Sequence, residues 1–142
     1  MILVADTGAL YALYDAGDEH HLRVRSVLEK HQGPIVVPVA ILAEVDYLLR
    51  EWLGVDAELD FLDSLEAGAF QLEPFTPSDL QRCRELVAKY RDLKLGIADA
   101  SVIATAERLG TNQILTVDER DFRAVTSKKG KAFTLLPADS PA

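Results

Sequence analysis

The chain has 142 residues, of which 49% are apolar and 27% charged, and its formal net charge is −8 at pH 7. This size and composition indicate one globular domain and exclude a disordered or fibrous chain, while the negative charge disfavours a general nucleic-acid coat. The single Cys83 excludes an internal disulfide, no apolar run approaches the roughly 20 residues of a membrane span, and the start "MILVADTG" contains no basic leader, so we expect a cytoplasmic protein without a secretion signal.

Short apolar strands alternate with longer helical patterns along the whole chain. The pattern predicts strands at 1–5, 35–38, 69–75, 112–118 and 131–137. It predicts helices at 6–17, 18–32, 39–54, 55–68, 76–93 and 95–110. Thr76 and Pro77 provide a helix start, and Gly54 and Gly110 each follow a helix end. This alternation indicates an α/β fold with a parallel sheet covered on both faces, as one domain over 1–136 with a flexible C-terminal tail at 137–142.

Charge is distributed unevenly between the two halves of the sequence. Residues 1–81 contain 4 Lys and Arg against 15 Asp and Glu, whereas residues 82–142 contain 11 against 8. A local basic surface and an ordinary solvated helix face both fit this pattern. The basic side chains lie in two groups around the acidic motifs described next: Arg82, Arg84, Lys89, Arg91 and Lys94, then Arg120, Arg123, Lys128, Lys129 and Lys131.

Two acidic residues come at the ends of predicted strands. Asp6 follows the strand at 1–5, and Asp118 ends the strand at 112–118. Ligands of open α/β sheets bind beyond the carboxyl ends of the strands, so both positions suit a binding site. Asp is also a favourable helix N-cap, and taken singly each residue fits capping better than ligand binding.

Two further carboxylates lie in apolar helices without a basic neighbour. Glu44 lies beside the apolar stripe of its helix, and the spacing predicts that it is partly buried, whereas nearby Asp46 has Arg50 four residues later as a partner. Asp99 lies in the first turn of the apolar helix at 95–110, where the helix dipole favours an acid. A buried carboxylate without a partner is unfavourable unless it is protonated or held by a cation.

If these four carboxylates converge at one edge of the sheet, they repel one another unless a hard cation lies among them. Oxygen ligands of this kind favour Mg²⁺ or Mn²⁺ over zinc, which prefers His or Cys. His20, His21 and His31 are expected to face solvent rather than to bind a metal.

Four motifs in order resemble the PIN domain family, and within it the VapC-type toxins of bacterial toxin–antitoxin pairs. They are "ADTGAL", the Glu in "ILAEVDYLL", "YRDLKLGIADASVIATAERLG" and "ILTVDERDF", and the similarity extends from residue 1 to about 136. The resemblance implies a Rossmann-like αβα sandwich and a Mg²⁺- or Mn²⁺-dependent endoribonuclease that leaves 5′-phosphate and 3′-hydroxyl ends.

The acidic positions of the family fall on Asp6, Glu44, Asp99 and Asp118, which are the expected catalytic residues. Our hypothesis is that Asp6 and Asp99 bind the metal, that Glu44 helps to hold or orient the metal and its waters, and that Asp118 completes the site as a third metal ligand. Thr7 and Thr116 occupy the small hydroxyl positions that flank the site. Asp121 either supports the metal shell or caps the turn before Phe122. The two groups of basic residues named above are candidate phosphate contacts for RNA.

The resemblance also implies an RNA substrate, a homodimer and a cognate antitoxin whose C-terminal segment blocks the site. The segments "LYALY" and "LLREWL" fit contact surface and core packing equally well. A phosphatase of the haloacid dehalogenase type needs a second Asp where this chain has Gly8, and a response-regulator receiver needs an acidic pair near the first strand. The remaining alternative is a catalytically silent PIN-like binding or scaffold module.

Overall fold

The computed structural model describes residues 1–141, and five short parallel strands form its centre. The strands are β1 (Leu3–Ala5), β2 (Ile35–Pro38), β3 (Gln71–Glu73), β4 (Gln113–Leu115) and β5 (Thr134–Leu136). Their order in the sheet is β3-β2-β1-β4-β5, and every neighbouring pair is parallel. The predicted α/β fold with a parallel sheet is therefore confirmed.

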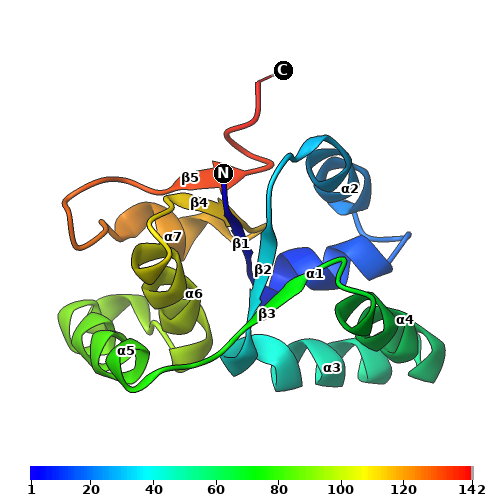
Figure 1. Ribbon diagram of the computed structural model, residues 1–142. Helices are drawn as coiled ribbons and strands as arrows, with labels where there is room; N and C mark the ends of the chain where they lie inside the picture. The colour runs from blue at the N-terminus through cyan, green and yellow to red at the C-terminus, as the bar shows by residue number, and fades with distance from the viewer. Residues whose placement is uncertain (142) are drawn as a thin grey trace.

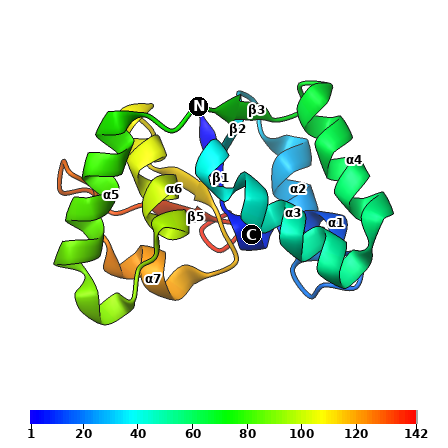
Figure 2. The same ribbon diagram turned by 90° about the horizontal axis from the view of Figure 1, so that it is seen from below.

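Helices cover both faces of this sheet (Figures 1 and 2). One layer contains α1 (Thr7–Tyr14), α2 (His21–Lys30), α3 (Val39–Leu53) and α4 (Val55–Glu66). The other contains α5 (Pro77–Lys89), the short 3₁₀ helix η1 (Arg91–Leu93), α6 (Ile97–Arg108) and α7 (Glu119–Ala124). None of the helices within residues 1–141 is both long and apolar enough to cross a membrane.

The strand order places a topological switch point between β1 and β4. The chain builds outward from β1 through β2 to β3, and then continues on the other side through β4 to β5. In doubly wound sheets the crevice at such a point, beyond the carboxyl ends of the strands, is where ligands bind. Asp6 directly follows β1, and Thr116 directly follows β4, so the fold brings both residues to this crevice.

The core explains why the central elements are so apolar. All three residues of β1 are fully buried, and Ile114 and Leu115 of β4 are buried beside them. In α6 every residue from Ala100 to Ala106 is buried, because the helix packs between the sheet and α5. The small side chains in this stretch let a helix approach the sheet closely. The prediction of a buried helix at this position is confirmed.

Two helical segments differ from the sequence prediction. The helix expected over 76–93 ends at Lys89, since Tyr90 leaves the helical conformation, and a separate 3₁₀ turn follows. No helix was predicted after Asp118, and a turn before Phe122 was one alternative, but Glu119–Ala124 forms α7 and buries Phe122. A helix of six residues has too few turns to produce a recognisable apolar periodicity.

The C-terminal segment is attached to the sheet through Asp139. Its carboxylate accepts a 2.7 Å hydrogen bond from the Leu135 backbone N–H and pairs with Arg123 at 2.5 and 2.8 Å. These contacts hold part of the stretch that was predicted to be a flexible tail. Ala142, the last residue of that stretch, lies outside the described residues.

Candidate metal centre

Asp6 is positioned by the end of β1 and the start of α1. It is the N-cap of α1, and its Oδ1 accepts a 2.9 Å hydrogen bond from the Ala9 N–H, which confirms the capping interpretation. Its Oδ2 accepts a 2.5 Å hydrogen bond from the Thr116 hydroxyl, across the switch point. The side chain is only 4% exposed. Burial raises the pKa of Asp6 to about 7 despite these two hydrogen bonds, and the nearby charges of Asp99 and Asp118 add to the increase.

Asp99 lies in the first turn of α6 and is half-buried at the same edge of the sheet. Burial, together with the charges of Asp118, Asp121 and Glu44, raises the pKa of its carboxyl group to about 6. Among residues 1–141, no Lys or Arg forms an ion pair with either Asp6 or Asp99. These two carboxylates therefore lack a compensating positive charge from the described residues, as the sequence predicted.

Asp118 and Asp121 complete a cluster of carboxylates around Asp99. One oxygen from each of the three residues lies within 4.8 Å of the others. Asp118 occupies the N-cap position of α7, but its side chain makes no capping bond, so the capping alternative for this residue is wrong. Its backbone N–H instead donates a 3.0 Å hydrogen bond to Thr116 Oγ1. Asp121 is 8% exposed and lies in the first turn of α7, inside the cluster rather than in a turn.

The structure corrects the prediction that Glu44 is partly buried. Glu44 is exposed rather than partly buried, because α3 turns its Ile41, Val45 and Leu49 stripe to the core and leaves position 44 outside. Its charge still raises the pKa of Asp99, so it lies near the acidic cluster. The expected partner of Asp46 also differs, since Arg50 Nε lies 3.9 Å from a Glu58 carboxylate oxygen.

The donor set fits a hard divalent cation. Three carboxylates converge within reach of one ion, and within the described part of the chain the candidate group includes no His or Cys. Thr116 helps to hold Asp6 and Asp118 in place, because its hydroxyl donates to Asp6 and accepts from the backbone N–H of Asp118. Thr7, the first residue of α1, is half-buried beside Asp6. Oxygen ligands of this type suit Mg²⁺ or Mn²⁺.

The close contact of Gly8 with Val117 near the site was not predicted from the sequence. A Cβ added to Gly8 would lie 3.1 Å from Val117 Cγ2, which is closer than an ordinary van der Waals contact. Gly8 therefore lets α1 approach the segment between β4 and α7. That segment carries Thr116 and Asp118, so the contact helps to set the separation of the two halves of the site.

Several basic residues that were predicted to bind RNA are already paired within the protein. Arg82 makes two hydrogen bonds to Glu107, of 2.7 and 3.0 Å, and its side chain is largely buried. Arg123 is bound by Asp139 and Glu119. Because these two guanidinium groups already form ion pairs within the protein, they are poor candidates for phosphate contacts.

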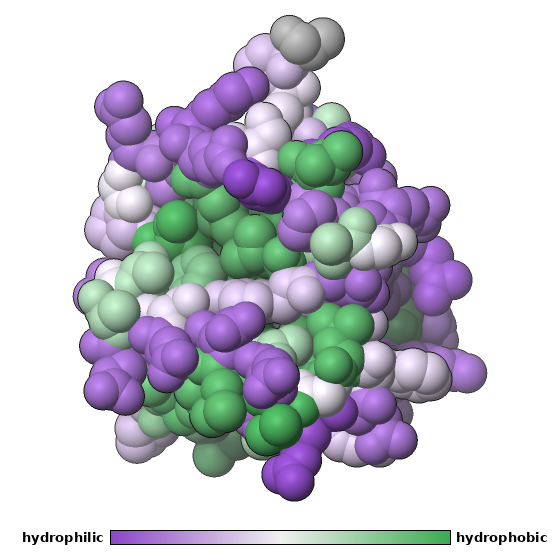
Figure 3. Space-filling model, turned by 90° about the vertical axis from the view of Figure 1, so that its right-hand side faces the viewer, coloured by the Kyte–Doolittle hydropathy of each residue, from purple (hydrophilic) through white to green (hydrophobic). Residues whose placement is uncertain are grey.

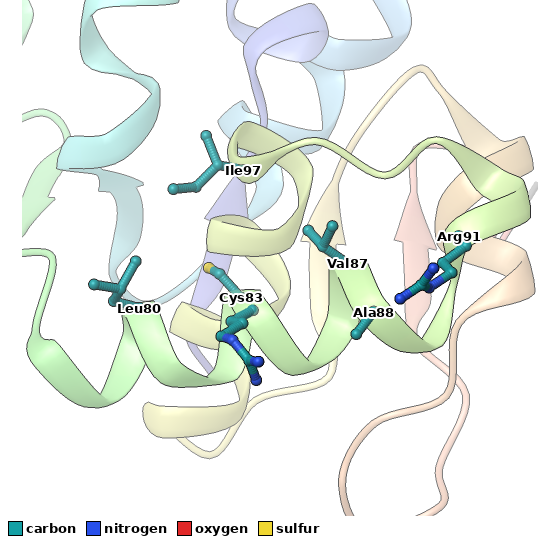
Figure 4. Close-up of a pocket in the computed structure, with 7 residues that line it drawn as sticks. Leu80, Cys83, Val87, Ala88, Arg91 and Ile97 are labelled. Atoms are coloured by element: carbon teal, nitrogen blue, oxygen red, sulfur yellow. The ribbon is translucent and has the colours of Figure 1, made fainter.

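The other predicted contacts remain exposed. Arg84 and Arg91 lie along a surface cavity of about 420 Å³ between α5 and the start of α6 (Figure 4), which is otherwise lined by Leu80, Cys83, Val87, Ala88 and Ile97. Lys89 Nζ lies 5.3 Å from the centre of the Tyr90 ring. Lys94 and Arg120 are also exposed, and Arg120 Nε lies 3.7 Å from a carboxylate oxygen of Asp121 in the acidic cluster.

Comparisons with known proteins agree with this geometry. The PIN domain family matches residues 3–128. Ribonuclease VapC26 of Mycobacterium tuberculosis is 37% identical over 135 residues, which make up 95% of this chain and 100% of that protein.

Solved structures share the fold at lower identity. The structure of VapC20 of M. tuberculosis, described as a Sarcin-Ricin loop cleaving toxin, has a TM-score of 0.77 at 19% identity and covers 83% of this chain and 91% of that one. FitAcB from Neisseria gonorrhoeae has a TM-score of 0.67 at 20% identity, with 94% and 97% covered. The family match over most of the sequence and the 37% identity with VapC26 show that this chain belongs to the PIN domain family and is a homologue of the VapC-type ribonucleases.

Proposed function

We propose that this protein is a metal-dependent endoribonuclease that acts as the toxin of a toxin–antitoxin pair. The observation that carries the proposal is the cluster of Asp99, Asp118 and Asp121, whose oxygens lie within 4.8 Å of one another. The name of the VapC26 relative, a ribonuclease, supports RNA as the substrate.

The residues of the site divide into ligands and supports. Asp99, Asp118 and Asp121 would hold Mg²⁺ or Mn²⁺, and Asp6 would complete the shell from the other side of the switch point. Thr116 fixes the orientation of Asp6, because its hydroxyl donates to one carboxylate oxygen while Ala9 N–H occupies the other. Glu44 is exposed at the rim, where it can orient water rather than pack against the core.

When bound, such an ion supplies a water of lowered pKa and stabilises the charge that develops on the scissile phosphate. The protein contributes a fixed set of negative oxygens, with the end of β1, the first turn of α6 and the start of α7 setting their spacing. Burial of Asp6 and Asp99 excludes water from the rear of the site, which strengthens the attraction between the carboxylates and the cation. Basic residues at the same edge, including Lys94 and Arg120, would contact the flanking phosphates of the RNA.

Asp99→Asn tests the activity directly. We expect Mg²⁺- or Mn²⁺-dependent cleavage of RNA to fall by roughly a hundredfold or more, since one ligand charge is lost while the shape of the side chain is kept. Asp92→Asn, in η1, is a matched control on an exposed carboxylate and should cleave as the wild type does. Cleavage retained by a folded Asp99→Asn variant, or wild-type protein that binds RNA without cutting it, would favour the scaffold alternative.

The proposed antitoxin would cover the side of the protein formed by α3 and α4. On that side hydrophobic residues are exposed among hydrophilic ones (Figure 3). The exposed aromatic side chains of α3 are Trp52, with 71% of its surface exposed, and Tyr47, with 58%. The two predicted contact segments therefore contain both core and surface residues. Leu10 and Leu49 lie in the core, whereas Trp52 is exposed. The two helices contain eight acidic residues against one basic residue, Arg50, so a segment rich in Lys and Arg fits them electrostatically.

Expression with and without the neighbouring gene product tests this partner. We expect growth arrest on expression of the protein alone, relief on co-expression, and loss of that relief with Trp52→Asp. Sedimentation of the purified protein tests the proposed homodimer separately. If the neighbouring gene product does not relieve the growth arrest, the antitoxin proposal is wrong. The ribonuclease proposal is tested separately by the cleavage assay.

A further inference from the structure

A tight turn displays three lysines at the opposite end of α6 from the acidic cluster. The turn runs from Ser127 to Lys131, whose backbones are joined by a 2.8 Å hydrogen bond from Ser127 N–H to Lys131 C=O. Gly130 N–H donates to Ser127 C=O at 2.8 Å, and Ser127 Oγ accepts from Lys131 N–H at 3.1 Å. An antiparallel bridge between Thr126 and Ala132 closes the turn. The lysines therefore project from an ordered support.

The lysine turn (Ser127–Lys131) borders a surface cavity of about 330 Å³ together with the end of α6. Its lining includes Lys128, Lys129 and Lys131, polar Thr111 and Asn112, and one acid, Glu107. Glu107 is already neutralised, because both of its oxygens accept from Arg82 and one also accepts a 2.6 Å hydrogen bond from Lys128 N–H. The acid in the lining is therefore occupied, and the charge that remains at the cavity is positive.

The ammonium groups at this cavity are free to bind a ligand. The ion pairs within residues 1–141 involve Arg and His side chains and include no lysine. Lys128, Lys129 and Lys131 are all exposed. In a protein with a net charge of −8, three unpaired lysines within four positions form a local anion-binding surface.

Basic residues connect the lysine turn to the acidic site. Thr126 N–H donates a 3.2 Å hydrogen bond to the Tyr90 hydroxyl, so the turn begins beside the end of α5, where Lys89 lies over the Tyr90 ring. Arg91 and Lys94 follow in the chain toward Asp99. Asp99 and Glu107 are eight residues apart on α6, so the acidic cluster and the lysine turn are separated by about 12 Å along the helix. At a rise of roughly 3.4 Å per nucleotide in a stacked strand, about four consecutive phosphates on one side of the cleaved bond span that distance.

We propose that the lysine turn is a second contact for the phosphate backbone of the RNA substrate, about 12 Å along α6 from the site of cleavage. The proposal rests on the ribonuclease function and specifies how the substrate is selected. RNA that extends from the acidic cluster to the lysine turn gains affinity from both, whereas a fragment of a few nucleotides reaches only one. The contact is with phosphates and so reads length and shape rather than base sequence.

The test removes two of the charges with Lys128→Gln/Lys129→Gln. Cleavage of a stem-loop RNA of about 25 nucleotides should fall roughly tenfold more than cleavage of a tetranucleotide, and the slope of log affinity against log salt should decrease by about two. Lys128→Arg/Lys129→Arg, which keeps the charges, should restore both values. Binding is measured by fluorescence anisotropy in the Asp99→Asn background, so that the result does not depend on turnover.

Arg23→Gln/Lys30→Gln is the matched control, because it removes two exposed charges on α2, which lies in the helix layer across the sheet from α6 (Figure 1). It should leave both RNAs bound and cleaved as in the wild type. Equal effects of the two double variants, or loss of binding to a protein partner with RNA binding unchanged, would overturn the lysine-turn proposal. Wild-type protein that binds the stem-loop through the lysine turn but cuts no RNA would contradict the proposed enzyme and not this contact.

Discussion

The α5–α6 hairpin brings a carboxylate to each of its ends, and the two ends compensate that charge in different ways. At the end away from the site, Asp79 is 2% exposed and makes two hydrogen bonds to Arg108, of 2.9 and 3.1 Å. Burial alone would raise the pKa of Asp79, but the hydrogen bonds from Arg108 and Thr76 outweigh it and hold the pKa below its usual value. At the site end, Asp99 has no such partner and its pKa is raised to about 6.

Asp6 sharpens the contrast, because it is as buried as Asp79 and yet its pKa rises to about 7. Two buried carboxylates in one small protein therefore shift in opposite directions. The difference is an arginine: Asp79 has a guanidinium beside it, while Asp6 has a hydroxyl and a backbone N–H. Asp79 is compensated by an arginine of the chain itself, whereas Asp6 and Asp99 have no basic partner within residues 1–141, as expected of candidate metal ligands.

The largest expected effect is the loss of stability on removal of Arg108, the partner of Asp79. Arg108→Ala should lower the free energy of unfolding by about 3 kcal/mol, because Asp79 and half-buried Glu73 lose their partner. Urea denaturation measures the change. Arg123→Ala, which removes a more exposed pair with Asp139, should cost less than about 1 kcal/mol. Equal losses from both variants would show that burial does not distinguish the two ion pairs.

A smaller effect is expected from the support of the site. Thr116→Val removes the hydroxyl that donates to Asp6 and accepts from Asp118 N–H, so the affinity for Mn²⁺ should fall roughly ten- to a hundredfold. Isothermal titration with Mn²⁺ measures this affinity without RNA. Thr116→Ser keeps the hydroxyl and should bind within a few-fold of the wild type. If Thr116→Val binds equally well, the hydrogen bond is structural only.

The smallest expected effect is the pH dependence of stability, and the two ends predict opposite signs. Asp6 and Asp99 have raised pKa values, so in EDTA the folded state binds protons that the unfolded state has released, and stability falls as pH rises from about 5 to 8. Asp79, with a lowered pKa, contributes stability that is lost only as pH falls below about 4.

Urea midpoints in EDTA across this range measure the dependence. Asp6→Asn/Asp99→Asn should flatten the decrease between pH 5 and 8, and saturating Mn²⁺ should abolish it, because the ion keeps the folded carboxylates deprotonated over the whole interval. A midpoint of the metal-free wild type that does not change over that interval would contradict the raised pKa values.

Much of the architecture could be predicted from local patterns. The buried run of β1, the Thr76 and Pro77 helix start and the Gly110 helix end all lie where the sequence placed them. These features depend on a few neighbouring residues, so a linear pattern contains them. The acid of α6 was recognised in the same way, because a carboxylate in an apolar helix without a basic neighbour is unfavourable by itself.

The errors arose where the outcome depends on contacts between distant segments. Glu44 was expected to be partly buried, but the packing of α3 leaves it outside. Arg82 was a candidate RNA contact, yet Glu107, 25 residues away, binds it. Both residues lie near the edge of an apolar face, where the helical period alone does not decide which side packs.

The sequence by itself determined the α/β class, the order of its strands and longer helices, and the acids that lack a nearby counter-charge, because periodicity and local pairing are properties of neighbouring residues. Only the tertiary structure decided which carboxylates share a site. The strand order brings β1 beside β4, and this contact joins Asp6 to Thr116 across 110 positions of the chain. Likewise, α7 places Asp121 beside Asp99 and Asp118, since the spacing of charges in three dimensions is set by how the sheet is connected.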